Sequence, residues 1–276
     1  MNNEPTTVSQ RLFPPRREAL VVLLLTFFAF VGVSFLGERA LGKGQILLGE
    51  AFAVVPAYLY VRWRRYNPAL IFRLRPVGWR LAMTSVLIGL ALTFVADELD
   101  RLMNLLLPFP EELANLLQQL LIARSFMDWI IILFGAVLLA GLFEEMLFRG
   151  FVQNSLEQHY GDVTRAVLWT AVLFAVIHFN PWWIVQIVLL GVFLGVMAWK
   201  SDSIVPGAIV HAINNGISVA IINAGEEKFD ILEWHGHLHP LLLLAAIAAL
   251  ALGLRLFYQF CEEETGSPTL LNSPLS

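Results

Sequence analysis

Two adjacent acidic residues interrupt an apolar stretch near the middle of the chain. Glu144 and Glu145 lie among small and hydrophobic residues, where charged side chains are costly to place in a membrane and tend to be functional. Glu145 precedes Arg149 by four residues, the favoured order for an ion pair on one face of a helix. Glu144 then lies on a different face without a local partner. We therefore interpret Glu145 as structural and Glu144 as the carboxylate available for chemistry.

Two later stretches add histidines and an amide. His178 follows Phe174 by four residues, and His211 precedes Asn215 by four, so each pair occupies one face of a helix. Glu144 and His178 both lie 17 residues from Gly161, which marks a polar turn. At 1.5 Å per residue, both are about 25 Å from that turn. We expect Glu144 and His178 at matching depth on adjacent helices, with His211 and Asn215 on a third helix and Phe174 in the wall of the site.

These residue types suit the hydrolysis of a peptide bond. That reaction needs a base to activate water and a group to stabilise the developing oxyanion. A carboxylate in an apolar setting is a good base near neutral pH, which assigns Glu144 this role. The histidines and Asn215 could hold the water, donate to the oxyanion or bind a metal. Zinc takes His and Glu ligands and keeps one position open for water, so Glu144, His178 and His211 are its candidate ligands if a metal is used.

Other hydrolytic signatures are missing from the sequence. It contains no His-Glu-x-x-His and no Gly-x-Ser-x-Gly, and its one cysteine, Cys261, lies near the C-terminus. One cysteine also excludes a Cys-rich zinc site or an internal disulfide. The residue types fit two mechanisms equally well: attack by a zinc-bound water, or attack by a water that Glu144 alone activates.

The composition is that of an integral membrane protein. The chain is 58% hydrophobic and 14% charged, whereas a soluble domain carries about a quarter charged residues. The apolar runs lack the alternation of strands, and a membrane span needs about 20 apolar residues as helix. We predict an all-α, polytopic transmembrane bundle of about eight spans. The candidate spans are 19–39, 45–62, 79–96, 128–149, 164–180, 181–200, 203–222 and 239–257; the second contains Glu50 near one end.

The distribution of arginine predicts the orientation in the membrane. Arginines gather in the N-terminal segment and in the loop between the second and third spans, whereas the loops 97–127 and 223–238 are rich in acidic residues. Because arginine and lysine favour the cytoplasmic side, we expect both termini there. We divide the chain into a cytoplasmic segment (1–18), N-terminal helices with an outer amphipathic loop (19–124), a catalytic core (125–222), and an outer loop, last helix and cytoplasmic tail (223–276). No basic tract indicates nucleic acid.

Two outer segments have open interpretations. Pro110 and the acidic pair after it are typical of a helix start, and the leucines between 113 and 121 predict an apolar face. This helix could lie on the membrane surface or pack over the bundle. His235, His237 and His239 alternate in a way that could bind a metal, although a solvated loop is the more common reading.

Taken in order, the motifs Glu-Glu-x-x-x-Arg, Phe-x-x-x-His and His-x-x-x-Asn resemble those of the CPBP family of intramembrane proteases. That family includes the type II CAAX prenyl endopeptidases and the bacterial Abi proteins linked to bacteriocin self-immunity. The resemblance covers roughly residues 125–222. It implies that Glu144 activates the water, that His178, His211 and Asn215 complete the site, and that Glu145 and Arg149 support it.

The resemblance also implies a CAAX-type endopeptidase, of metalloprotease or glutamate type, in a bacterial inner membrane. Its partners would be the lipid bilayer and a protein or peptide substrate with a membrane-proximal segment. Two other functions remain open. One is a catalytically silent interaction or immunity protein, and the other is a proton-coupled transporter, which also uses buried Glu and His. The concentration of polar residues in the fourth, fifth and seventh predicted spans favours a single site over a transport path.

Overall fold

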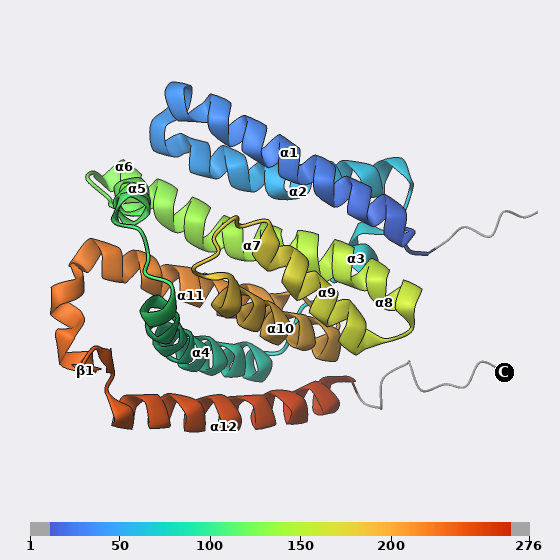
Figure 1. Ribbon diagram of the computed structural model, residues 1–276. Helices are drawn as coiled ribbons and strands as arrows, with labels where there is room; N and C mark the ends of the chain where they lie inside the picture. Colours follow the sequence, from blue (N-terminus) through green and yellow to red (C-terminus); the bar gives the residue numbers. More distant parts are fainter. Residues whose placement is uncertain (1–11, 266–276) are drawn as a thin grey trace, which may run out of the picture.

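The computed structural model describes residues 12–265 and is an all-α helical bundle (Figure 1). Residues 1–11 of the predicted N-terminal segment and 266–276 of the predicted C-terminal tail lie outside the described residues. The long helices are α1 (Arg16–Leu41), α2 (Gln45–Trp63), α4 (Trp79–Leu106), α10 (Ile184–Ser201), α11 (Val205–Ala224) and α12 (Pro240–Thr265). The shorter elements are η1 (Gly42–Gly44), α3 (Pro68–Ile71), α5 (Glu111–Leu121), α9 (Val163–Val176), η4 (Glu226–Leu232), β1 (Glu233–Trp234) and β2 (His237–Leu238).

One continuous helical rod runs through the centre of the bundle. It consists of α6 (Phe126–Ile131), the π-helical η2 (Ile132–Leu139), α7 (Ala140–Glu145), the π-helical η3 (Met146–Gln153) and α8 (Asn154–Tyr160). The predicted span 128–149 is therefore only part of a helix of 35 residues. In Figure 1 the α1–α2 pair lies on one side of the rod, whereas α4 and α12 lie on the other. The rod thus carries the paired glutamates in the middle of the molecule.

Among residues 12–265, seven helices are long and apolar enough to cross a membrane. They correspond to seven of the eight predicted spans, and the chain is an integral membrane protein. The eighth prediction, 164–180, was too long, because α9 has only 14 residues and ends at Val176. Asn180 precedes Pro181 and is thereby disfavoured from helix, and Phe179 adopts a positive φ of 49°. His178 consequently lies in the turn after α9 instead of inside it.

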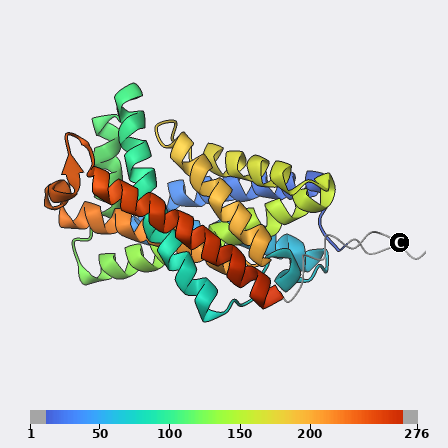
Figure 2. The same cartoon turned by 90° about the horizontal axis from the view of Figure 1, so that it is seen from below.

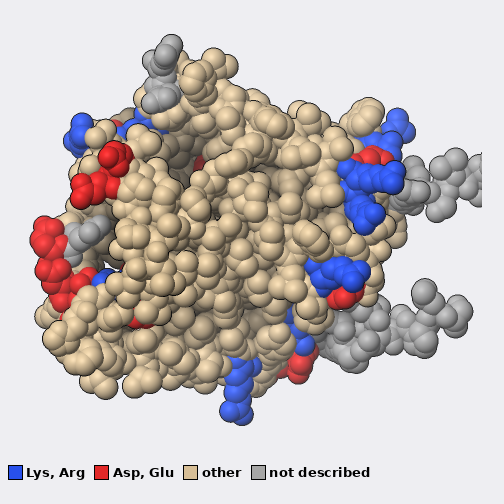
Figure 3. All heavy atoms as spheres, in the orientation of Figure 1, with Lys and Arg blue, Asp and Glu red and all other residues tan. Residues whose placement is uncertain are grey.

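Charged side chains are unevenly distributed over the surface of the molecule. Figure 3 shows lysine and arginine mainly at one end of one face and acidic residues mainly at the other; the broad region between them has few charges, apart from one basic side chain at its lower edge. Helix α1 begins, and helix α12 ends, at the same end of the bundle in Figure 1. Although α9 is short, it returns the chain across the bundle between α8 and α10. This return is the reason why α1 begins and α12 ends at the same end of the bundle.

The predicted amphipathic helix forms as α5, which contacts α11 and leaves Leu116 exposed. At the same end, β1 and β2 form a hairpin, seen at the edge of the bundle in Figure 2. The His235–Gly236 turn of this hairpin has positive φ at both residues, as a tight two-residue turn requires. His237 Nδ1 lies 2.8 Å from a carboxylate oxygen of Glu98 on α4. The alternating histidines are therefore part of a hairpin docked on α4.

Candidate active site

The structure brings Glu144 together with both predicted histidines. Glu144 lies on α7, His178 in the turn after α9 and His211 on α11. Oε2 of Glu144 is 4.0 Å from Nε2 of His178 and 3.9 Å from Nε2 of His211. That oxygen is buried and has no hydrogen-bond partner within the described residues. Three polar side chains, two from helices and one from a turn, thus converge, and the contact between Glu144 and His178 agrees with the matching depth predicted for this pair.

The other ring nitrogen of each histidine is fixed by an acceptor. Nδ1 of His178 lies 2.6 Å from the backbone carbonyl oxygen of Phe174, and Nδ1 of His211 lies 3.2 Å from Oε1 of Glu145. Carbonyl and carboxylate oxygens only accept hydrogen bonds, so both Nδ1 atoms carry the proton. In the neutral rings both Nε2 atoms then present a lone pair toward Glu144. Two hydrogen-bond acceptors, the Nε2 atoms, and one candidate base, the Glu144 carboxylate, therefore face the same point.

The predicted ion pair between Glu145 and Arg149 is present and fully buried. Nη1 of Arg149 donates to Oε1 of Glu145 at 2.6 Å, and Nη2 donates to the Gly191 carbonyl. The Glu145 oxygen that accepts from Arg149 also accepts from His211. Glu145 therefore orients His211, and Arg149 binds the same carboxylate at a position where both side chains are fully buried. Removing one partner of such a buried ion pair lowers the free energy of unfolding by about 3–5 kcal/mol.

Phe174 lies among the site residues, as expected for a wall residue. Its ring makes edge contacts with the rings of His178 at 4.8 Å and His211 at 5.8 Å between centroids. The guanidinium of Arg149 stands over its face at 4.2 Å, a favourable cation–π geometry. Phe174 is almost completely buried. It sets the spacing of the two histidines through packing and anchors His178 through its backbone carbonyl.

Asn215 connects α11 to the rod. Its Nδ2 donates to the carbonyl oxygen of Ala136 at 3.0 Å, two helical turns before Glu144. This contact with the rod was not predicted from the sequence. Near the same level, Gly141 allows α11 to approach, since a Cβ there would lie 3.1 Å from the backbone nitrogen of Ala212. Asn215 and Gly141 both fix how closely α11 packs beside α7.

Comparison with known protein families finds a match for one part of the chain. Residues 126–217 match the family model of Rce1-like type II CAAX prenyl endopeptidases. This region is similar to that family, and we call residues 126–217 the Rce1-like domain. No curated protein and no solved structure matches the chain. The match covers a third of the chain and confirms, at the level of the family, the resemblance that the motifs indicated.

The Rce1-like domain begins at α6 and ends within α11, so it contains the whole triad of Glu144, His178 and His211. Its rod is π-helical on both sides of α7, in η2 and η3. Such segments are rare and are frequent at functional sites. By widening the helix, they change the direction of side chains relative to a regular α-helix. Nothing in the sequence indicated them to us.

A carboxylate outside the Rce1-like domain also belongs to the surroundings of the site. Glu50 lies on α2, which packs against α7 and η2. Its Oε2 is buried without a hydrogen-bond partner within the described residues. The sequence carried the same signal here as for Glu144, namely an acid in an apolar span. No role for Glu50 was predicted from the sequence.

The donor types of the triad suit zinc, but their spacing is wide. In a tetrahedral site with bonds near 2.1 Å, two ligand atoms are about 3.4 Å apart, compared with 3.9 and 4.0 Å here. Over residues 12–265, no group of three His, Cys, Asp or Glu side chains is arranged to hold a metal. The hairpin histidines His235, His237 and His239 are among the side chains that form no such group. At these distances the atoms are too far apart for a direct hydrogen bond, which is the situation in which a bridging water is to be considered.

Proposed function

We propose that this protein is an intramembrane endopeptidase in which Glu144 activates the attacking water. The observation that carries the proposal is the convergence of two Nε2 lone pairs on one buried oxygen of Glu144. The Rce1-like family supports a peptidase of the CAAX type. His178, His211 and Asn215 are the proposed partners of Glu144, with Glu145, Arg149 and Phe174 holding them in place.

In the proposed reaction, a water donates one hydrogen bond to Glu144 and the other to the Nε2 atom of a histidine. Glu144 removes a proton as the water oxygen attacks the carbonyl carbon of the peptide bond. The carbon–nitrogen bond then breaks, and the departing amine takes the proton from Glu144. Asn215 keeps a second N–H after donating to Ala136, and this is the proposed donor to the oxyanion. No step needs a metal, so zinc is the alternative to be tested.

The proposed substrate is a protein or peptide with a segment at the membrane. Glu144 and His211 lie on helices that are long and apolar enough to cross a membrane, so a substrate must present its bond from the bilayer or its surface. The gathering of arginine at one end supports an orientation with both termini in the cytoplasm. We propose the inner membrane of a bacterium as its location, because of the likeness to bacterial members of the family.

The test is cleavage of membrane-anchored peptides by the purified protein in lipid vesicles. A library of fluorogenic peptides carrying a lipid near the scissile bond would be screened with wild type, Glu144→Gln and the matched control Glu262→Gln. Glu262 lies on α12, is largely exposed and pairs with Lys200. We expect cleavage by wild type and the control, and a loss of at least about 100-fold in Glu144→Gln, as expected for a general base.

Two outcomes would favour another function. Equal cleavage of an established substrate by wild type and Glu144→Gln would remove Glu144 from the chemistry. Proton flux into the vesicles that depends on Glu144, without cleavage of any peptide, would indicate a transporter. A silent interaction protein predicts neither activity and a cellular phenotype that survives Glu144→Gln.

A further inference from the structure

The buried side chain of Arg73 lies outside both the triad and the Rce1-like domain. Arg73 follows α3 in the connection between α2 and α4. It is 5% exposed and has a positive φ of 49°, an uncommon conformation for a residue with a side chain. A buried charge and a strained backbone both cost free energy, so strong contacts must hold this residue in place.

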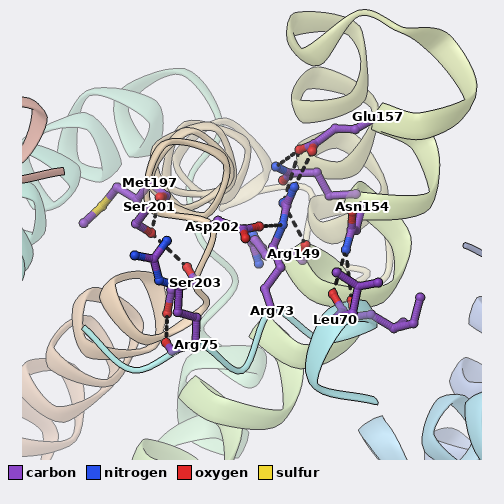
Figure 4. Close-up of polar contacts among 12 residues, drawn as sticks. Leu70, Arg73, Arg75, Arg149, Asn154, Glu157, Met197, Ser201, Asp202 and Ser203 are labelled. Carbon is purple, nitrogen blue, oxygen red and sulfur yellow. Dashed lines mark hydrogen bonds and ion pairs between the residues drawn. The ribbon is translucent and has the colours of Figure 1, made fainter. Parts of the chain in front are cut away.

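Those contacts join three parts of the molecule, as Figure 4 shows. Nη1 and Nη2 of Arg73 form a fork with the carboxylate of Glu157 on α8. Nη1 also donates to the backbone carbonyl of Arg149 in η3 at 3.3 Å. Nε lies 3.4 Å from a carboxylate oxygen of Asp202, in the turn between α10 and α11. One guanidinium therefore connects the rod with the start of α11.

The backbone around Arg73 is held to the same two places. The Arg73 carbonyl accepts a hydrogen bond from the backbone nitrogen of Ile204 at 3.1 Å, immediately before α11. On the side of the rod, Phe72 lies directly on Gly150, where an added Cβ would be only 2.7 Å from the Cα of Phe72. Glycine is thus required next to Arg149 for this close approach. The strap formed by residues 72–75 is docked against the rod and the base of α11 together.

Two routes lead from Arg73 to His211. Along the rod, Arg73 contacts the Arg149 carbonyl, the Arg149 side chain binds Glu145, and Glu145 accepts from Nδ1 of His211. Along α11, Arg73 holds the turn from which this helix starts, and His211 lies two turns further on. The first route holds Glu145, the partner of His211, and the second holds α11, the helix that carries His211. Both routes therefore affect the position of the same imidazole.

We propose that Arg73 is a positioning residue for His211, which it aligns by clamping the rod to the base of α11. The proposal rests on the proposed function for its effect on the reaction, but the orientation of His211 can be measured without any substrate. Arg73 does not touch the triad. Losing it should therefore lower kcat while leaving KM close to that of wild type.

The test compares Arg73→Gln, Arg73→Lys and the matched control Arg64→Gln. Arg64 forms an exposed ion pair with Glu18 and lies on the same connection. In the vesicle assay we expect kcat to fall about tenfold in Arg73→Gln, within the range of mutations that act through a network, with KM changed less than about twofold. Lysine retains the charge without the planar fork. Arg73→Lys should therefore fold, and its kcat should fall less than that of Arg73→Gln. The control should match wild type.

A second readout is independent of proteolysis. Protein labelled with ¹⁵N-histidine would be studied by NMR in detergent, with the His211 signal identified through its loss in His211→Ala. Wild type should show His211 protonated at Nδ1 and bare at Nε2. In Arg73→Gln we expect this signal to shift toward a mixture of the two tautomers, whereas the signal of His237, held by Glu98, stays unchanged.

The outcomes separate this proposal from the proposed function. An unchanged His211 signal in Arg73→Gln would overturn the positioning role, as would a wild-type kcat or a loss confined to KM. If Arg73→Gln does not fold, a wild-type signal and kcat in Arg73→Lys would overturn it equally. If wild type cleaves no peptide, the proposed function fails, and the NMR comparison still decides the role of Arg73.

Discussion

The buried pair of Glu145 and Arg149 allows a prediction of stability from geometry alone. Both side chains are completely buried, and Oε1 of Glu145 accepts from Arg149 at 2.6 Å. Replacing Glu145 by alanine would leave the Arg149 charge inside the protein. Three contacts would remain to it, namely the Gly191 carbonyl and the rings of Phe174 and Phe148.

We expect Glu145→Ala to lower the free energy of unfolding by about 3–5 kcal/mol, the usual cost of removing one partner of a buried ion pair. The same change removes the acceptor of His211 Nδ1, so the folded fraction should also lose most of its activity. Glu145→Leu combined with Arg149→Met should be more stable than Glu145→Leu alone, because no charge is then left unpaired.

The assay is equilibrium unfolding in mixed detergent micelles, followed by circular dichroism at low protein concentration. Glu262→Ala is the control, since an exposed ion pair contributes about 0–1 kcal/mol. A free energy of unfolding for Glu145→Ala within about 1 kcal/mol of wild type would refute the reasoning. It would mean that water or another group compensates Arg149.

Three further predictions address the surroundings of the triad. Glu50→Met should raise the free energy of unfolding by about 1–3 kcal/mol, because it removes a buried carboxylate oxygen without a partner; a destabilised variant in the same unfolding assay would show that Glu50 has a structural partner. Gly141→Val should destabilise the protein by about 1–3 kcal/mol through overpacking against Ala212 and reduce peptide cleavage, whereas retained activity and stability would contradict the close packing of α11. Active wild-type protein should contain far less than one zinc per chain by elemental analysis; stoichiometric zinc that disappears in His178→Ala and His211→Ala would establish a metal site instead.

Local spacing predicted the parts of the site that depend on one helix or on one turn. The ion pair of Glu145 and Arg149 followed from their separation by four residues, because that separation places two side chains on the same helical face. The matching depth of Glu144 and His178 followed from equal distances to the turn at Gly161. Both are confirmed by contacts in the structure.

Features that depend on contacts between distant segments could not be obtained in this way. The end of α9 before His178 is set by Phe179 and Pro181, and the hydrophobicity of the segment hid it. The π-helical stretches depend on how the rod packs and have no clear sequence signal. Arg73 looked like one of several cytoplasmic arginines, because its partners Glu157 and Asp202 are far away in the chain.

The shortness of α9 has a consequence for the lipid around the protein. Fourteen helical residues span about 21 Å, whereas the hydrocarbon layer of a bilayer is about 30 Å thick. A helix that is too short for its bilayer is accommodated by local thinning. The thinned region would lie beside the turn that carries His178, bringing water and lipid headgroups nearer to the triad. Acyl-chain length would then affect the proposed peptidase activity, which should be lower in vesicles of longer lipids.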